Sequence, residues 1–168
     1  KALEEQTELA GVRVALLGAG GAARAVGYGL AQKSARVTVY NRSVKPAQLM
    51  ADEFSLDFGG VLDEFPGCAD FDILINCTSI GFQSPDDCPV AERTMETSLS
   101  PDTIVMDVVF LPPQTRLLRE AGAAGCRTVQ GARMLLHQAC GQVELYTGCQ
   151  APIGMMEEVL EKEILKMM

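Results

Sequence analysis

Short apolar runs rich in β-branched residues alternate with longer segments of helical spacing along the chain. The short runs predict buried strands at 14–17, 35–41, 56–58, 71–79, 103–110 and 126–129. The longer segments predict helices at 22–33, 46–54, 114–124, 132–147 and 152–165. Alternation of strand and helix calls for a parallel sheet joined by right-handed crossovers. The predicted fold class is therefore α/β, a doubly wound and mainly parallel six-stranded sheet with helices on both faces.

Length and composition fit one domain. With 168 residues, of which 48% are hydrophobic, the chain is long enough for one well-filled core and short for two. We expect a domain at 11–148, preceded at 1–10 by the end of a connecting helix. The segment 149–168 is expected to be a helix that packs on this domain or on a missing half. No apolar run approaches the roughly 20 residues of a membrane span, and the N-terminal residues lack the apolar centre of a signal peptide. These features predict a soluble, cytoplasmic protein.

The stretch from Val14 to Ala25 predicts a strand, a tight turn and the first turn of a helix. In its pattern Gly18-x-Gly20-x-x-Ala23, Gly18 lets the chain turn sharply and Gly20 lets a pyrophosphate approach the backbone without meeting a Cβ. Ala23 keeps the helix close to the sheet, and the free amides of the helix start face the anion. A tight turn without a ligand is the alternative. Because the glycines lie between a strand and a helix, we favour the phosphate-binding corner of a Rossmann-type dinucleotide fold.

The charge distribution points to a small anionic ligand. A net charge of −8 argues against nucleic-acid or anionic-membrane binding through bulk electrostatics. Residues 11–50 contain no Asp or Glu, and they hold six basic residues, Arg13, Arg24, Lys33, Arg36, Arg42 and Lys45. This local excess suits a site for a multiply charged small anion, with a solvated basic face as the alternative.

The segment after the second predicted strand indicates which dinucleotide is bound. Asn41, Arg42 and Ser43 begin 23 residues beyond Gly18, where a free ribose 2′-hydroxyl would favour an acidic residue. Arg42 can instead pair with a 2′-phosphate through two N–H groups, Ser43 can donate a hydrogen bond, and Lys45 adds a positive charge. We therefore predict NADP rather than NAD as the cofactor. A surface arginine that merely ends the strand is the alternative.

The cysteines and the single histidine argue against a metal site. The six cysteines form no C-x-x-C pair, and most lie in apolar surroundings, which is typical of reduced thiols in a core. His137 is the only histidine, so a site with several histidine ligands is excluded. We expect no metal in this chain.

Polar residues follow two further predicted strands. Thr78 and Ser79 come after the fourth strand and suit contact with the nicotinamide ribose or the diphosphate of a cofactor, or an ordinary Ser/Thr turn. Asp107 is a lone acid within an apolar strand, and we expect a hydrogen-bonded core acid rather than a catalytic one.

The helix that begins near Gly131 supplies candidates for the substrate end of the site. Met134 is typical of a core residue, and Gln138, one turn further on, is the polar group best placed to reach a substrate. His137 lies one helical step around from Gln138, so we expect it to face away. The sequence offers no general acid in this chain.

Five blocks occur in the order seen in shikimate dehydrogenases, namely GAGGAARA, NRS, INCTSIGF, VMDVVF and GARMLLHQACGQVELYTG. The chain resembles that family from Gly11 to about Leu165. The resemblance implies the NADP-binding domain of an enzyme that reduces 3-dehydroshikimate to shikimate in aromatic amino-acid (chorismate) biosynthesis. It also implies that the substrate is shared with an N-terminal domain.

The residues and the resemblance together give a predicted site. The cofactor-binding residues are Gly18, Ala19, Gly20, Gly21 and Ala22 at the diphosphate, Asn41, Arg42, Ser43 and Lys45 at the 2′-phosphate, Thr78, Ser79 and Val108 elsewhere along the cofactor, and Gly131 and Met134 beside the nicotinamide. The substrate-binding residues are Gln138 and Phe110.

The chain also departs from the family pattern. Phe110 stands where the family usually has a tyrosine, and Pro46 where a basic residue is common. The family places a proton-transferring lysine and aspartate in a domain before the glycine turn, and Lys1 does not match that lysine. We therefore expect a fragment, or one domain of a longer or multifunctional protein, that has no catalytic residue and is inactive by itself.

Other functions stay open. A non-catalytic binding or regulatory module resembling shikimate dehydrogenases would tolerate Phe110, and a quinate/shikimate dehydrogenase would share the same site. A reductase for a different ketone or aldehyde is a further alternative, against which the MLLHQA block speaks. The sequence leaves open whether copies of the chain form a homo-oligomer.

Overall fold

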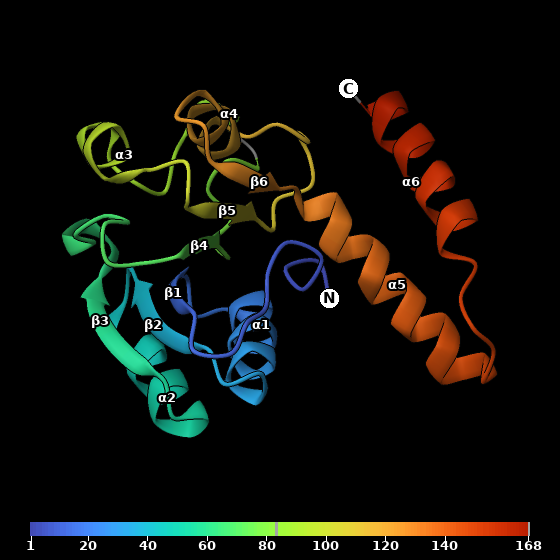
Figure 1. Cartoon of the computed structure of the whole chain (residues 1–168), viewed down its shortest axis with the longest axis horizontal. Coiled ribbons are helices and arrows are strands. Elements are labelled where there is room, and N and C mark those ends of the chain that lie inside the picture. The colour runs from blue at the N-terminus through green and yellow to red at the C-terminus, as the bar shows by residue number, and fades with distance from the viewer. Residues whose placement is uncertain (83, 168) are drawn as a thin grey trace.

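The computed structural model describes residues 1–82 and 84–167, and the strands of this part form one parallel six-stranded sheet. Its order is β3-β2-β1-β4-β5-β6, with β1 (Arg13–Leu17), β2 (Arg36–Asn41), β3 (Asp57–Val61), β4 (Ile73–Asn76), β5 (Ile104–Asp107) and β6 (Arg127–Val129). The helices are α1 (Gly21–Gln32), α2 (Val44–Phe54), α3 (Glu92–Ser98), α4 (Arg116–Ala123), α5 (Gly131–Thr147) and α6 (Ile153–Met167), with a 3-10 turn η1 (Leu62–Glu64). The predicted doubly wound α/β fold is confirmed (Figure 1). Met168, the last residue of the predicted segment 149–168, lies outside the described residues.

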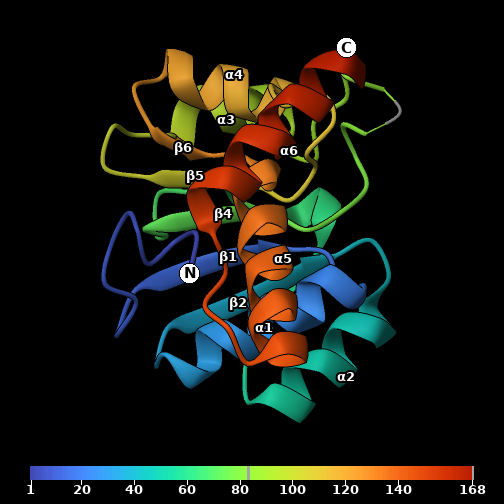
Figure 2. The ribbon, with the colours of Figure 1, turned by 90° about the vertical axis from the view of Figure 1, so that its right-hand side faces the viewer.

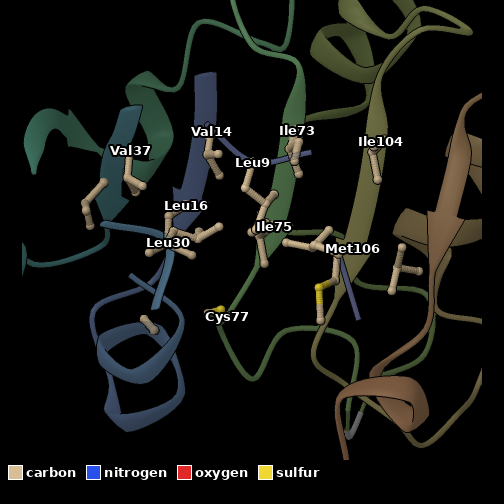
Figure 3. Close-up of a cluster of buried hydrophobic side chains, with 14 of the residues drawn as sticks. Leu9, Val14, Leu16, Leu30, Val37, Ile73, Ile75, Cys77, Ile104 and Met106 are labelled. Carbon is tan, nitrogen blue, oxygen red and sulfur yellow. The ribbon is translucent and has the colours of Figure 1, made fainter. Parts of the chain in front are cut away.

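Alternate side chains of the strands face two separate cores, as the period of a strand requires. On one face Val14 and Leu16 of β1 pack with residues of α1, α2 and the N-terminal segment (Figure 3). On the other face Ala15 and Leu17 pack with residues of α3 and α4. Burial on both faces explains why the strands are continuous apolar runs.

The passage from β1 to α1 depends on residues of little bulk. Gly18 has a φ of +109°, and a Cβ there would lie 2.9 Å from the carbonyl oxygen of Cys77. Ala23 is fully buried, and a Cβ on Gly27 would lie 2.5 Å from the terminal methyl of Met50. These contacts bring α1 close to the sheet, and they give Gly18 and Ala23 the structural roles predicted for them.

Strands β4 and β5 are shorter than predicted because their last side chains redirect the backbone. β4 ends at Asn76 and β5 at Asp107. The side chain of Asn76 accepts a hydrogen bond from the amide of Thr78, and that of Asp107 accepts one from the amide of Val109. Such local bonds compete with the sheet ladder and turn the chain into loops.

Other departures from the predicted elements have local causes. α3 was not predicted, and Met95 is its only buried residue, so its sequence carries little helical periodicity. β3 continues through two glycines because Gly59 has no side chain: a Cβ there would lie 2.3 Å from the ring of Tyr40. Ser43 is the N-cap of α2, and its side chain makes no capping hydrogen bond.

The N-terminal segment forms turns, and the connecting helix expected to end within residues 1–10 stays a prediction. Residues 2–6 form turns, and Leu3 and Leu9 are buried against the α1 face of the sheet. Burial of these two side chains fixes the segment to the core. The segment lies between α1 and α5 in Figure 1.

Ion pairs hold this segment to the C-terminal helices. Glu5 contacts the Arg133 guanidinium through both carboxylate oxygens at 2.7 Å, and its Oε1 lies 2.8 Å from Nε2 of His137. Arg133 also pairs with Glu157 of α6. We call these four residues the N-terminal clasp, since they join three segments distant in sequence.

Helices α5 and α6 form a pair at one side of the molecule (Figures 1 and 2). Leu136 and Cys140 of α5 pack against Met156 and Leu160 of α6. α6 thus packs on α5, and the division of the chain at 148 and a contact of α6 with a further half stay predictions. Within residues 1–82 and 84–167, no helix combines the length and apolar character that a membrane crossing requires.

All six cysteines are free thiols, and four of them, Cys68, Cys77, Cys126 and Cys140, are buried. Burial raises the pKa of the Cys68 thiol to about 11, so this thiol is protonated at neutral pH. These four cysteines are core residues, as the sequence predicts for most of the six, whereas Cys149 is exposed.

The clasp predicts a stability that fades in acid. Hydrogen bonding from Arg133 lowers the pKa of Glu5 to about 2, from 4.5 in an unfolded chain. Because the folded-state pKa is depressed, this contribution is present above about pH 4.5 and is lost as the pH falls toward 2. Glu5→Gln should therefore lower the free energy of unfolding at pH 7 by about 1 kcal/mol, a figure discounted because the Glu5 side chain is 34% exposed.

Urea unfolding at several pH values measures this effect. The difference between parent and Glu5→Gln should shrink below pH 4.5. Glu8→Gln is the matched control, because Glu8 is exposed and makes no ion pair within the described residues. A pH-independent difference would contradict the role of the Glu5 charge.

Candidate functional site

The predicted cofactor residues gather at one edge of the sheet. In the parallel register Leu17 of β1 is paired with Tyr40 of β2 and with Asn76 of β4, and Asn76 with Asp107 of β5. The carboxyl ends of these four strands therefore lie side by side, and we call this side the carboxyl edge. In open α/β sheets, ligands bind outside the carboxyl ends of the strands, near the point where strand order reverses. Here that point lies between β1 and β4.

The glycine turn after β1 presents an open helix start. The amide of Gly18 donates to the carbonyl of Tyr40 at 2.7 Å, which anchors the turn. Gly20 is the N-cap of α1, and no side chain caps the helix or places an acid in its first turn. A Cβ on Gly20 or Gly21 would meet no described atom within 4 Å. The first amides of α1 are thus accessible to an anion, and the positive end of the helix dipole favours one.

The segment after β2 carries exposed cations. Asn41 donates from Nδ2 to the carbonyl of Ser43 at 2.8 Å, which shapes the loop. Arg42, Ser43 and Lys45 are exposed, and within the described residues neither cation has an acidic partner. Since β1 and β2 are neighbours, these groups follow the strand beside the glycine turn.

Ion pairs refine the charge pattern of residues 11–50. Arg13 pairs with Asp72, Arg24 with Glu53, and Lys33 with Glu4. In the described part of the chain, the basic residues of this stretch without such a partner are Arg36, Arg42 and Lys45. Arg36 begins β2 at the opposite edge. The unpaired positive charge at the carboxyl edge therefore belongs to Arg42 and Lys45.

The loops after β4 and β5 are held by buried polar side chains. Thr78 donates from Oγ1 to Oδ1 of Asn76 at 2.7 Å, while Ser79 is exposed. Asp107 is fully buried and accepts hydrogen bonds from Asn76, Val109 and Thr115. Burial raises the pKa of Asp107, and these hydrogen bonds oppose the rise. Asp107 is thus a hydrogen-bonded core acid, as predicted.

A hollow of about 840 Å³ joins the glycine turn to α5. We call it the α1–α5 hollow. Gly21 and Ala22 line it on one side, and Met134 and Gln138 on the other. The structure therefore brings predicted diphosphate residues and predicted nicotinamide and substrate residues to one space.

His137 does not face away from this hollow, contrary to the prediction. It lines the hollow together with Gln138, and its ring is held by Glu5. The side chain is 14% exposed. The N-terminal segment, which folds back over α5, turns this side of the helix into part of the hollow, and the sequence of α5 alone cannot show that.

The other predicted residues lie beside the hollow. Gly131 begins α5 against the loop after β5, where a Cβ would lie 2.5 Å from the carbonyl oxygen of Val108. Val108 and Met134 pack against the same core. Phe110 is half-buried beyond β5 and is not among the described residues that line the hollow, so its predicted substrate contact stays a prediction.

Sequence reasoning missed one wall of the hollow. Ala25, Val26 and Gly29 line it with Ala22. Their spacing of i, i+3, i+4 and i+7 places these small residues on one face of α1. This helical periodicity is the sequence signal from which the wall of the hollow could have been predicted.

Two family models match the chain. Residues 1–107 match the shikimate / quinate 5-dehydrogenase model, and residues 131–161 match the shikimate 5′-dehydrogenase C-terminal domain. The shikimate dehydrogenase (NADP(+)) of Halorubrum lacusprofundi is 42% identical over 158 residues, which cover 94% of this chain and 56% of that protein. That of Pyrococcus abyssi is 40% identical over 160 residues, or 95% of this chain and 58% of that protein. The chain thus spans just over half the length of these relatives.

Solved structures agree. Shikimate 5-dehydrogenase from Thermus thermophilus, in complex with NADP(H) and shikimate, has a TM-score of 0.82 and 32% identity over 96% of this chain and 59% of its own. The ligand-free 5-ketofructose reductase of Gluconobacter sp. strain CHM43 has a TM-score of 0.85 and 39% identity over 96% of this chain and 60% of its own. With the family model covering residues 1–107 and relatives above 30% identity, the chain belongs to the shikimate / quinate 5-dehydrogenase family.

Proposed function

We propose that this chain is the NADP-binding domain of a shikimate 5-dehydrogenase, an enzyme that reduces 3-dehydroshikimate to shikimate with NADPH. One observation carries the proposal. The start of α1 has no side-chain cap and begins with glycines, and it lies beside the end of β2. The two cations that follow β2, Arg42 and Lys45, have no acidic partner in the described chain. Support comes from relatives named shikimate dehydrogenase (NADP(+)) and from the Thermus structure in complex with NADP(H) and shikimate.

The two parts of the carboxyl edge would bind different phosphates. The first amides of α1, at Gly21 and Ala22, would donate to the diphosphate. Arg42 would bind the 2′-phosphate through two parallel N–H groups, with Lys45 adding charge and Ser43 a hydroxyl. Asn41 would hold the loop through its bond to the Ser43 carbonyl.

The α1–α5 hollow would receive the reacting end. Met134 would pack beside the nicotinamide, and the Gln138 amide would orient the substrate through hydrogen bonds. The bound cofactor supplies a hydride to the ketone carbon, and the developing alkoxide then needs a proton. By resemblance that proton comes from a lysine and an aspartate of an N-terminal domain, so we propose that this chain alone turns over little substrate. Its cytoplasmic location and any homo-oligomer stay predictions.

A reductase for another ketone is the second candidate. The 39% identity and TM-score of 0.85 with a 5-ketofructose reductase favour it. Both candidates use the same cofactor site and differ only in the ketone.

Arg42→Gln tests the cofactor site. Fluorescence titration of the parent chain should show binding of NADPH at least about tenfold tighter than of NADH, because charge-assisted bidentate bonds require the 2′-phosphate. The substitution should weaken NADPH binding about 10- to 100-fold and leave NADH binding nearly unchanged. Arg36→Gln is the control, since Arg36 begins β2 at the opposite edge of the sheet, whereas Arg42 follows the end of this strand. Equal affinity of the parent for both cofactors would contradict the proposal.

Turnover separates the candidates. We expect the chain alone to bind NADPH without consuming it when 3-dehydroshikimate is added. We expect a longer parent protein, which includes the proposed N-terminal domain, to reduce 3-dehydroshikimate faster than 5-ketofructose. Faster reduction of 5-ketofructose would favour the second candidate. Inactivity of the parent protein on both would favour a binding module, and measurable turnover by the chain alone would refute the need for outside groups.

A further inference from the structure

A continuous network of polar side chains, three of them buried and that of Thr78 half-buried, joins the ends of β4 and β5. It consists of Asn76, Thr78, Asp107 and Thr115, and we call it the carboxyl-edge network. Asn76 and Asp107 are register partners, the last residues of adjacent strands, and both are 0% exposed. Two polar side chains placed there must satisfy each other and their surroundings, because water does not reach them.

Asn76 uses its whole hydrogen-bonding capacity. Its Nδ2 donates to Oδ1 of Asp107 at 2.9 Å and to the carbonyl of Ile80 at 3.2 Å. Its Oδ1 accepts from the amide of Thr78 at 3.0 Å and from the Thr78 hydroxyl at 2.7 Å. The Thr78 hydroxyl in turn accepts from the amide of Ile80 at 3.1 Å. The loop after β4 is therefore bound to the strand end at both Thr78 and Ile80.

Asp107 binds the loop after β5 to the end of that strand. Its Oδ1 accepts from the amide of Val109 at 3.0 Å, in addition to Asn76. Its Oδ2 accepts from the Thr115 hydroxyl at 2.7 Å, and Thr115 caps α4 by accepting from the amide of Leu118. Asp107 thus links both loops and the start of α4 through one carboxylate.

These loops carry cofactor residues that lie away from the adenosine end. Thr78 and Ser79 belong to the first loop and Val108 to the second, whose backbone touches Gly131 at the start of α5. Arg42 and Lys45 follow β2, which is separated from β4 by β1. The network therefore supports one half of the proposed cofactor site and not the other.

We propose that Asp107 is a positioning residue that fixes the two loops around the nicotinamide half of the cofactor. The inference rests on the proposed NADP site. Its consequence is a split: loss of the carboxylate weakens contacts to the nicotinamide half and leaves those to the adenosine 2′-phosphate half intact.

Two probes measure the split. NADPH reaches both halves of the site, and adenosine 2′,5′-bisphosphate reaches only the adenosine half. For Asp107→Ala we expect NADPH affinity to fall at least about tenfold and bisphosphate affinity to stay within about twofold. The fluorescence change of the nicotinamide on binding should shrink in the same variant. Asp107→Asn keeps an acceptor for Asn76 and Val109, so it should restore most of the NADPH affinity.

Two milder substitutions test the same inference with less risk that the variant fails to fold. Thr115→Val removes the hydroxyl that Asp107 accepts from and keeps the side-chain shape, and it should lower NADPH affinity alone, about three- to tenfold. Thr103→Val is its matched control, since Thr103 is also a buried threonine but lies at the opposite end of β5. Thr103→Val should leave both affinities unchanged.

The outcomes are distinguishable. A parent chain that binds neither probe contradicts the proposed function and this inference with it. If the unsubstituted chain binds both probes, and the Asp107 and Thr115 variants lose affinity for both probes equally or for neither, the inference is overturned and the proposed function stands. A parent that binds NADPH no better than the bisphosphate also overturns it.

Discussion

The contact of Gly18 with the backbone of Cys77 is the constraint on which the rest of the structure depends. A side chain at Gly18 would overlap that backbone, since even a Cβ would lie 2.9 Å from the Cys77 carbonyl oxygen. Because Gly18 has no side chain, the backbone can turn from β1 into α1 while β1 stays paired with β4. The start of α1 is thereby fixed at the point where strand order reverses, beside the ends of β2, β4 and β5. The residues proposed to bind the cofactor follow one of these strand ends, line the hollow next to them or, in the case of Gly131, pack against the loop after β5.

The positive charge at the carboxyl edge comes from cations that have no acidic partner among the described residues. The protein has a net charge of −8, and acidic residues neutralise Arg13, Arg24 and Lys33. Arg42 and Lys45 form no ion pair with a described acidic residue, so the unpaired positive charge of residues 11–50 at the carboxyl edge is theirs. The open amides of α1 add to it without a side-chain charge. Such an arrangement recognises phosphates and explains how an acidic protein can bind a highly anionic ligand.

Much of the fold could be predicted because apolar runs and helical spacing report burial directly. The glycine turn and the segment Asn41 to Ser43 could also be placed, since each follows a strand. The strand ends at Asn76 and Asp107 could not, because side chains that bond their own backbone look like strand residues in an apolar pattern. The N-terminal turns and the position of His137 depend on the long-range contact between Glu5 and α5, which no local pattern encodes. The short helix α3 has a single buried residue and left no periodic signal.

The central claim is that the carboxyl edge of this chain binds a dinucleotide at α1 and β2 together. Amide chemical shifts of the ¹⁵N-labelled chain, followed during titration with NADPH, locate the contact residue by residue. The account predicts the largest changes at Gly20 and Gly21 and at Arg42 and Ser43, saturating with one common affinity. Changes confined to the amino ends of the strands or to α3 and α4, or no saturable change at all, would contradict it.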